Sequence, residues 1–405
     1  MMFTATNSES IALRNKFKKY AILFGVLFFS SLNSAAQQEY ILLDADAAEL
    51  AQQKYSQHVQ VIRQHDENMI LKIDSSIREE LAHELHEEFK SCGSFMSLNS
   101  EQEAMSLIQS FETQLYQSIS LADYQINRQS TVNGMFPQVS ASKVKNLIEK
   151  LSAFHTRAAM TSHGRDSVEW LMKHWRQITK QRSDIIVQKI EHSWRQPSLM
   201  AMIRGSENPE RYIVIGGHVD SLNYTSSVDH APGADDNASG TAAVSEILRV
   251  LSHMSYSPKN TIVFFAYSFE EGGLHGSQDI AQIFSERNKE VLGVLQLDMI
   301  LHNNQNSQPI YFITNDTHHG QNQFLMNLMQ SYQLGSYATG PLSGGTSDHR
   351  SWTLRGYPAS FPFESNQPFQ QLHTVNDTLP QAFTGDDLIT RFVKLGLAFA
   401  VELDQ

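Results

Sequence analysis

Three short apolar runs in this chain are each followed by polar side chains that can bind a metal ion. The runs span residues 211–219, 261–268 and 291–298, and they are rich in β-branched and aromatic residues. Such runs, bounded by glycine or polar residues, are typical of buried parallel strands. Strands and helices alternate as far as an expected last helix at 386–403, so the pattern predicts an α/β fold, with a mostly parallel mixed sheet covered by helices on both faces. In open sheets of this kind, ligands collect outside the carboxyl ends of the strands.

The polar residues near these strand ends, together with a histidine from a late loop, form a candidate ligand set for zinc. Zinc binds imidazole nitrogen and carboxylate oxygen readily, and a catalytic zinc site leaves a position for water. Two such ions about 3.5–4 Å apart form the clamp used by several classes of hydrolase. The candidate residues are His218, Asp236, Glu270, Glu271, Asp298 and His373.

Charge counting favours two metal ions over one. Asp236, Glu271 and Asp298 are carboxylates, and with one bridging hydroxide they would neutralise two divalent cations. A single zinc ion would leave surplus negative charge in a buried site, which is costly. Glu270 would then remain available for proton transfer.

Each of these residues also has an ordinary structural explanation. A histidine after a strand is usually packed or solvated, and Asp236 precedes an expected helix at 238–254, where a turn and a helix cap are common. Glu270 and Glu271 could be acids favoured by the dipole at the start of a helix. The joint occurrence of five ligand residues and a base at strand ends and loops favours the metal site.

Seven stretches occur in order between about residue 132 and the C-terminus: GGHVDS, APGADDNASGTAAVSEILRVL, FFAYSFEEGGLHGSQD, LQLDM, TSDHRSW, GYPASFPFES and LHTVNDT. Together they resemble the secreted bacterial leucyl aminopeptidases of metallopeptidase family 28. The resemblance implies that Asp236 is a carboxylate bridging two zinc ions. His218 and Asp298 would complete one zinc site, and Glu271 and His373 would complete the other.

The same resemblance implies further roles. Glu270 would be the general base, and Asp220 would orient the ring of His218, which fixes the tautomer of a metal ligand. The chain departs from the family in the loop at 342–346, where relatives carry a pair of cysteines; its only cysteine is Cys92. An apolar pocket for the substrate side chain would be lined by Met299, Phe361, Phe363 and Leu372.

The N-terminus predicts export. Four basic residues precede an apolar core at 20–29, and small residues follow at 34–36. This is the pattern of a signal peptide, here over residues 1–36, and it predicts a secreted protein. A retained membrane anchor is the alternative, although no later segment approaches the ~20 apolar residues that a transmembrane helix requires.

Residues 37–121 differ from the rest of the chain in their residue pattern, with many Glu and Gln in the expected helices, and contain no cluster of candidate metal ligands. Strands are expected at 40–43 and 68–73, and helices at 45–62, 77–89 and 100–118. This small α+β unit resembles in position the propeptide of the secreted enzymes, which implies an inhibitor or folding aid that is later removed. A permanent accessory domain is the alternative. Residues 122–405 would form the catalytic domain.

The sequence therefore predicts a secreted aminopeptidase with two Zn²⁺ ions that cleaves the N-terminal peptide bond of peptides and prefers bulky apolar N-terminal residues. We expect a monomer with no stable membrane span. We also expect no nucleic-acid partner, because the net charge of −12 is opposite in sign to the positive charge that binds nucleic acid. Three alternatives stay open. They are a one-zinc aminoacyl cyclotransferase, a carboxypeptidase, and a binding ectodomain without catalysis.

Overall fold

The computed structural model describes residues 37–90, 95–114, 124–226 and 229–405. Ala36–Gln405 belong to one compact unit. The expected signal peptide at 1–36 lies outside the described residues. Among the helices of the described part, none is long and apolar enough to cross a membrane.

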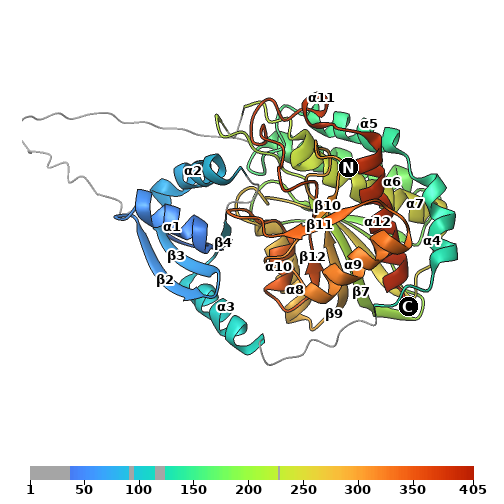
Figure 1. The fold of residues 1–405 in the computed structure, drawn as a ribbon, viewed down its shortest axis with the longest axis horizontal. Helices are drawn as coiled ribbons and strands as arrows, with labels where there is room; N and C mark the ends of the chain where they lie inside the picture. The colour runs from blue at the N-terminus through green and yellow to red at the C-terminus, as the bar shows by residue number, and fades with distance from the viewer. Residues whose placement is uncertain (1–36, 91–94, 115–123, 227–228) are drawn as a thin grey trace, which may run out of the picture. The chain divides into compact units, whose positions relative to one another are not determined.

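A small antiparallel sheet comes first in the described chain (Figure 1). Its strand order is β2-β3-β1-β4, from β1 (Gln38–Asp44), β2 (Val59–His65), β3 (Asn68–Asp74) and β4 (Met96–Leu98). One face packs against α1 (Ala45–Lys54) and α2 (Arg78–Phe89), which the short helix η1 (Ser75–Ile77) precedes. The helix α3 (Glu101–Gln114) follows β4. We call residues 37–107 the N-terminal unit.

One helix prediction in this unit was wrong. The helix expected at 45–62 ends at Lys54, and residues from Val59 onward form strand β2. The apolar residues Val59, Val61 and Ile62 carry the β-branched character that favours a strand. β2 pairs antiparallel with β3 along its length, and Asp66 takes the positive φ of 50° needed in the hairpin turn between them. The end of the helix expected at 100–118 lies outside the described residues.

The main sheet has six strands in the order β12-β9-β7-β8-β6-β5. The three predicted strands are β7, β8 and β9, which lie side by side and pair in parallel. β6 pairs antiparallel with β8, and the edge strand β5 pairs antiparallel with β6, whereas β12 pairs parallel with β9, so the sheet is mixed and mostly parallel, as predicted. The strands are β5 (Ile185–Ile190), β6 (Ser198–Ile203), β7 (Asn208–His218), β8 (Asn260–Tyr267), β9 (Glu290–Gln296) and β12 (Ala359–Ser360).

Helices cover both faces of this sheet (Figure 1). Side chains alternate along β7, so that Ile213 and Ile215 enter one core and Val214 enters the other. The larger core includes α5 (Ala141–Ser152), α6 (Ser162–Ile178), α7 (Gly240–His253), α9 (His319–Ser331) and α12 (Asp386–Leu403), and the smaller one includes α8 (His275–Glu286) and α10 (His349–Thr353). The remaining helical elements are α4 (Gln129–Met135), η2 (Phe136–Gln138), η3 (Ala234–Ser239) and α11 (Leu379–Ala382). A third sheet consists of β10 (Ile310–Ile313), β11 (Tyr337–Gly340) and β13 (Pro362–Phe363).

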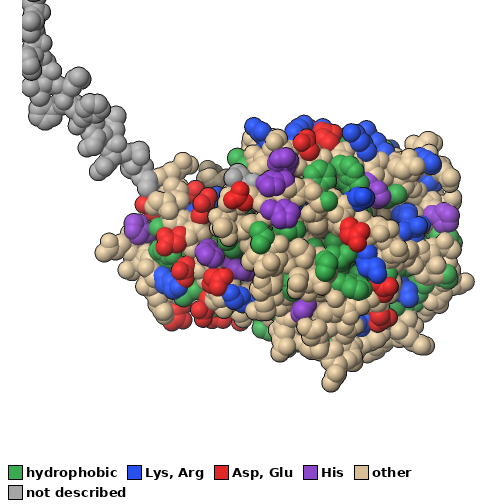
Figure 2. Space-filling model, turned by 90° about the horizontal axis from the view of Figure 1, so that it is seen from above, with side chains coloured by type: hydrophobic (Ala, Val, Ile, Leu, Met, Phe, Trp, Pro, Cys, Tyr) green, Lys and Arg blue, Asp and Glu red, His purple; other side chains and the backbone are tan. Residues whose placement is uncertain are grey.

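On the face drawn in Figure 2, Lys and Arg side chains are interspersed with Asp and Glu and form no continuous basic patch. This agrees with the acidic net charge of −12.

Candidate active site

The ends of the three central strands deliver most of the candidate residues to one place. His218 is the last residue of β7, Glu270 and Glu271 follow β8, and Asp298 follows β9. Because these strands are parallel neighbours, their carboxyl ends meet at the same edge of the sheet. Asp236 joins them from the turn η3, which leads into α7.

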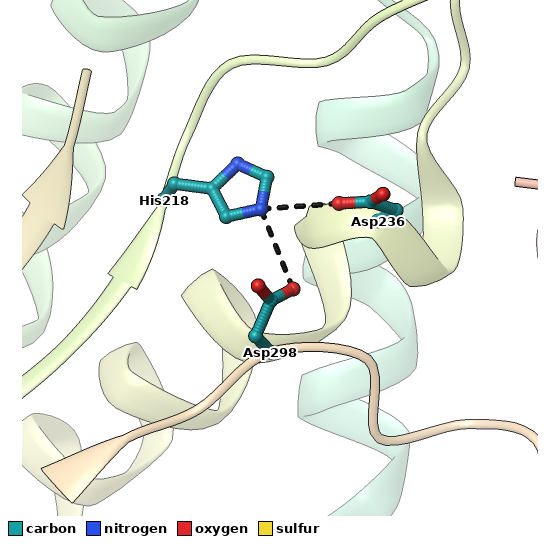
Figure 3. Close-up of side chains that lie close together, drawn as sticks. All are labelled: His218, Asp236 and Asp298. Carbon is teal, nitrogen blue, oxygen red and sulfur yellow. Dashed lines mark ion pairs between the residues drawn. The ribbon is translucent and has the colours of Figure 1, made fainter. Parts of the chain in front are cut away.

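The described residues contain two groups with the geometry of a metal site, and Asp236 belongs to both. In the first group, Nε2 of His218 lies 3.0 Å from Oδ1 of Asp236 and 3.3 Å from Oδ1 of Asp298 (Figure 3). In the second, Nε2 of His373 lies 3.0 Å from Oδ2 of Asp236 and 2.8 Å from Oε2 of Glu271. The two oxygens of one carboxylate thus face two separate sets of ligand atoms.

The buried polar atoms of these groups lack ordinary partners. Both ring nitrogens of His218 and of His373 and both carboxylate oxygens of Asp236 are buried, yet they make no hydrogen bond of good geometry among the described residues. Buried polar groups in proteins are nearly always satisfied. Imidazole nitrogens and carboxylate oxygens that converge without hydrogen bonds fit bound zinc.

The pKa shifts of the buried groups also indicate a cation site. Burial alone would lower the pKa of His218, but the carboxylates of Asp298 and Glu270 outweigh it and raise this pKa well above its usual range. Burial raises the pKa of Glu271 to about 7. The protein's own groups therefore leave an excess of negative charge in the site, which a divalent cation would neutralise.

Glu270 stands apart from the two ligand groups. Its side chain is completely buried, and Oε2 lies 4.0 Å from Nε2 of His218. Neither carboxylate oxygen has a hydrogen-bond partner among the described residues, and burial raises its pKa well above the usual range. A carboxylate with a raised pKa beside a metal site is suited to accept and return a proton near neutral pH.

Asp220 holds the turn that carries the two glutamates. Its Oδ1 lies 3.5 Å from Nδ1 of His218. The same carboxylate accepts hydrogen bonds from the backbone N–H groups of Glu270 at 3.1 Å and Glu271 at 3.2 Å. Asp220 therefore contacts His218 and the backbone of both Glu270 and Glu271 at once.

The structure adds three supporting residues that the sequence analysis missed. Asp377 accepts hydrogen bonds from the backbone N–H groups of Asp235 and Asp236 and so fixes Asp236, the residue that both candidate groups share. Ser347 donates to Oδ2 of Asp298 at 2.6 Å. The buried guanidinium of Arg157 donates to the backbone carbonyl of Gly233, just before η3. Asp377 lies four residues after His373 in the same loop, which was the one available signal.

The expected pocket residues are all in the apolar core. Met299, Phe361, Phe363 and Leu372 are completely buried and belong to the larger core of the main sheet. The rings of Phe361 and Phe363 pack edge to face at 5.2 Å. Phe361 also packs on His349, whose pKa burial lowers to about 3, so this histidine is neutral. A pocket role for these four residues stays a prediction.

Known proteins match this chain over the region that contains the site. The model of the peptidase family M28 matches residues 198–395. A probable aminopeptidase of Saccharomyces cerevisiae is 32% identical over 63% of this chain and 71% of that protein. A probable leucine aminopeptidase of Arthroderma benhamiae is 30% identical over 69% of this chain and 77% of its own length. The chain belongs to peptidase family M28.

Solved structures extend the similarity to the N-terminal unit. The LapA aminopeptidase of Legionella pneumophila has a TM-score of 0.75 and 26% identity, covering 91% of this chain and 99% of that one. LapB of the same organism gives 0.75 and 25% identity over 91% of this chain and 100% of that one. A zinc aminopeptidase of Bacillus subtilis shares the fold at 16% identity, with a TM-score of 0.54 over 64% of this chain and 94% of that one. The protein is a metallo-aminopeptidase with a zinc-exopeptidase fold.

Proposed function

We propose that this protein is a di-zinc aminopeptidase that removes bulky apolar residues, such as leucine, from the N-termini of peptides. One observation carries the proposal: the carboxylate of Asp236 lies between two sets of ligand atoms, 3.0 Å from Nε2 of His218 on one side and 3.0 Å from Nε2 of His373 on the other. His218, Asp236 and Asp298 would hold one ion, and Asp236, Glu271 and His373 the other.

The proposed mechanism uses the residues as the structure arranges them. Two zinc ions, when bound, would lower the pKa of a water molecule and polarise the scissile carbonyl. Glu270 accepts the proton of the attacking water and returns it to the leaving amine, so its raised pKa suits both steps. Asp220 keeps Glu270 and Glu271 in position through their backbone N–H groups. The carboxylates of the site also attract the α-ammonium group of a free N-terminus, which favours an exopeptidase.

Substrate preference tests the apolar pocket. We expect aminoacyl-p-nitroanilides of Leu, Met and Phe to be cleaved faster than that of Ala, because an apolar pocket gains about 1–3 kcal/mol for each extra methylene it buries. Lys and Glu derivatives should be poor substrates, since charged groups are costly in such a pocket. Faster cleavage of Lys or Glu derivatives than of Leu would contradict this preference. Cleavage of an amino-blocked leucine derivative would contradict the exopeptidase assignment.

Two other functions fit the structure less well. An aminoacyl cyclotransferase with one zinc ion would need only one of the two ligand groups, whereas both are complete here. A binding ectodomain would have no use for the buried base Glu270 beside a full ligand set. An amino-blocked peptide with a free C-terminus separates the third alternative. A carboxypeptidase would cleave this peptide, whereas an aminopeptidase would not.

The chain is also proposed to be a secreted zymogen. The signal-peptide pattern over 1–36 supports export. In the described part of the predicted propeptide, residues 37–121, no residue belongs to a metal-binding group, which supports later removal of that segment. Mass spectrometry of the protein from culture fluid is expected to find a mature N-terminus between residues 119 and 130. A fully active enzyme that begins at Gln37 would contradict an inhibitory role for this segment.

A further inference from the structure

Residues 192–198 connect strands β5 and β6, and their sequence is HSWRQPS. β6 runs antiparallel to β8, and Leu199 of β6 pairs with Ala266 near the end of β8. Ser198, the first residue of β6, therefore lies beside the carboxyl end of β8. The segment thus reaches the start of the turn that carries Glu270.

A buried histidine links this segment to helix α8. Nδ1 of His192 lies 2.8 Å from Oδ2 of Asp279, and Nε2 lies 2.8 Å from Oγ of Ser198. A carboxylate only accepts, so in the neutral tautomer that fits these partners Nδ1 donates to Asp279 and Nε2 accepts the hydroxyl proton of Ser198. Oγ of Ser198 in turn accepts the backbone N–H of Ser268 at 3.0 Å. The chain of hydrogen bonds ends two residues before Glu270.

The order of carboxylate, imidazole and hydroxyl is that of a serine hydrolase, but burial excludes this use. Ser198 is 0% exposed, and its Oγ already accepts a backbone N–H. The side chain of His192 is 1% exposed, and only Asp279 reaches the surface. A substrate carbonyl therefore cannot reach the hydroxyl. What the three residues hold is the backbone of Ser268.

Two further residues of the segment hold the side chain of Ser268. Its Oγ accepts a hydrogen bond from Nε1 of Trp194 at 2.9 Å and donates to Oε1 of Gln196 at 2.8 Å. Gln196 is completely buried and is itself anchored, since its Nε2 donates to the carbonyls of Arg157 and Gly164 at 2.9 and 3.0 Å. Both the backbone N–H and the hydroxyl of Ser268 are thus bound by this segment.

Phe269, the residue directly before Glu270, has an unfavourable backbone conformation. Its φ is +59°, a left-handed value that persists in a residue with a Cβ atom only where the surroundings hold it. The ring of Phe269 packs edge to face on Trp194 at 5.5 Å, and Trp194 stacks on His192 at 4.3 Å. Gly272 is fitted to the ring of Phe269, because a Cβ atom there would lie 2.0 Å from it. The segment therefore holds both residues that precede the base.

We propose that residues 192–198 position the general base: they fix the two residues before Glu270 and so the direction in which its carboxylate points. The inference rests on the proposed role of Glu270. Asp220 binds the backbone N–H of Glu270 separately, so the turn is held at two points. Displacement of a catalytic group by about 1 Å can cost on the order of 100-fold in rate. The expected signature is a loss of kcat while substrate and zinc still bind.

The test changes the segment and leaves Glu270 and every candidate metal ligand in place. In the zinc-loaded full chain, His192→Phe removes both ring nitrogens, and Trp194→Phe keeps a ring but removes the indole N–H. The matched controls are His174→Phe and Trp170→Phe, from a pair in α6 that also stacks, at 5.6 Å and 7°. We expect kcat for leucine p-nitroanilide to fall about tenfold or more in the first two variants. KM in these variants, and kcat in the controls, should stay within about twofold of the wild type.

A double variant separates positioning of the base from a general loss of structure. In the Glu270→Gln background, His192→Phe should lower kcat no further, because its effect in the wild type acts through Glu270. A loss of equal size in both backgrounds would overturn the inference. So would wild-type kcat in His192→Phe and Trp194→Phe, with folding checked by circular dichroism and loading by the zinc content.

A readout without catalysis separates this inference from the proposed function. Hydrogen–deuterium exchange with mass spectrometry follows the backbone N–H of Ser268, which is bound to Ser198. Peptides that cover residues 266–271 should exchange about tenfold faster or more in His192→Phe than in His174→Phe. Faster exchange together with near-normal turnover of Glu270→Gln would support the hold on this turn while refuting the base. Unchanged exchange in folded His192→Phe would overturn the inference.

Discussion

Replacing Glu270 with glutamine is expected to slow peptide hydrolysis on the order of 10²–10⁴-fold without loss of metal. Glutamine keeps the size of the buried side chain but cannot accept the proton of the attacking water. Glu270 lies outside both ligand groups, so both metal sites should stay intact. The measurements are kcat for leucine p-nitroanilide and the zinc content per chain by atomic emission.

The neighbouring residue gives the matched control. Glu271→Gln changes the same functional group one position along the chain, but Glu271 lies 2.8 Å from Nε2 of His373 and belongs to the second ligand group. It should weaken zinc binding at that group, whereas Glu270→Gln should not. A Glu270→Gln enzyme with both metals bound and near-normal turnover would exclude Glu270 as the base.

Removal of the metal is expected to abolish activity, and zinc is expected to restore it in proportion to the amount bound. The side-chain nitrogen and oxygen atoms of His218, Asp236 and His373 are buried and make no hydrogen bonds among the described residues, so we expect bound cations to be their partners. Chelation followed by titration with zinc should give full activity at two equivalents per chain. Bound zinc should also raise the melting temperature, because a ligand that binds only the folded state stabilises it.

The number of zinc ions at the plateau decides between the remaining functions. Full activity at one equivalent would favour a cyclotransferase-like site and contradict the two-ion proposal. Asp236→Asn gives an internal check, since Asp236 belongs to both ligand groups. This variant should weaken both sites together, whereas Asp298→Asn should weaken only the first.

The central fold could be predicted because its signals are local and strong. The three runs at 211–219, 261–268 and 291–298 are continuously apolar, and the structure places them as adjacent strands β7, β8 and β9. The last helix was predicted with its bounds unchanged, Asp386–Leu403, because an amphipathic pattern over many turns leaves little ambiguity. Strand β2 was missed because the helix that begins at Ala45 was extended through residues 55–62, although the β-branched residues there favour a strand.

The candidate site also contains residues that could be predicted from the sequence and residues that could not. Metal ligands at strand ends carry a recognisable residue type at a recognisable position, and the structure brings all six candidates together. Asp377 and Arg157 act through backbone groups of residues far away in the sequence, and an isolated Asp or Arg gives no sign of such a partner. The contact between His86 of α2 and His373 was equally invisible, because the two residues lie far apart in the sequence.

The order of the ligands along the chain has a consequence for biosynthesis. His218, Asp236 and Asp298 are all present before residue 300, but the second ligand group is complete only with His373, close to the C-terminal helix α12. A nascent or truncated chain that ends before this histidine can assemble the first ligand group and nothing more. The N-terminal unit is translated before every residue of the two ligand groups. Both groups can therefore be complete only after all but the last 32 residues of the chain, up to His373, have been translated.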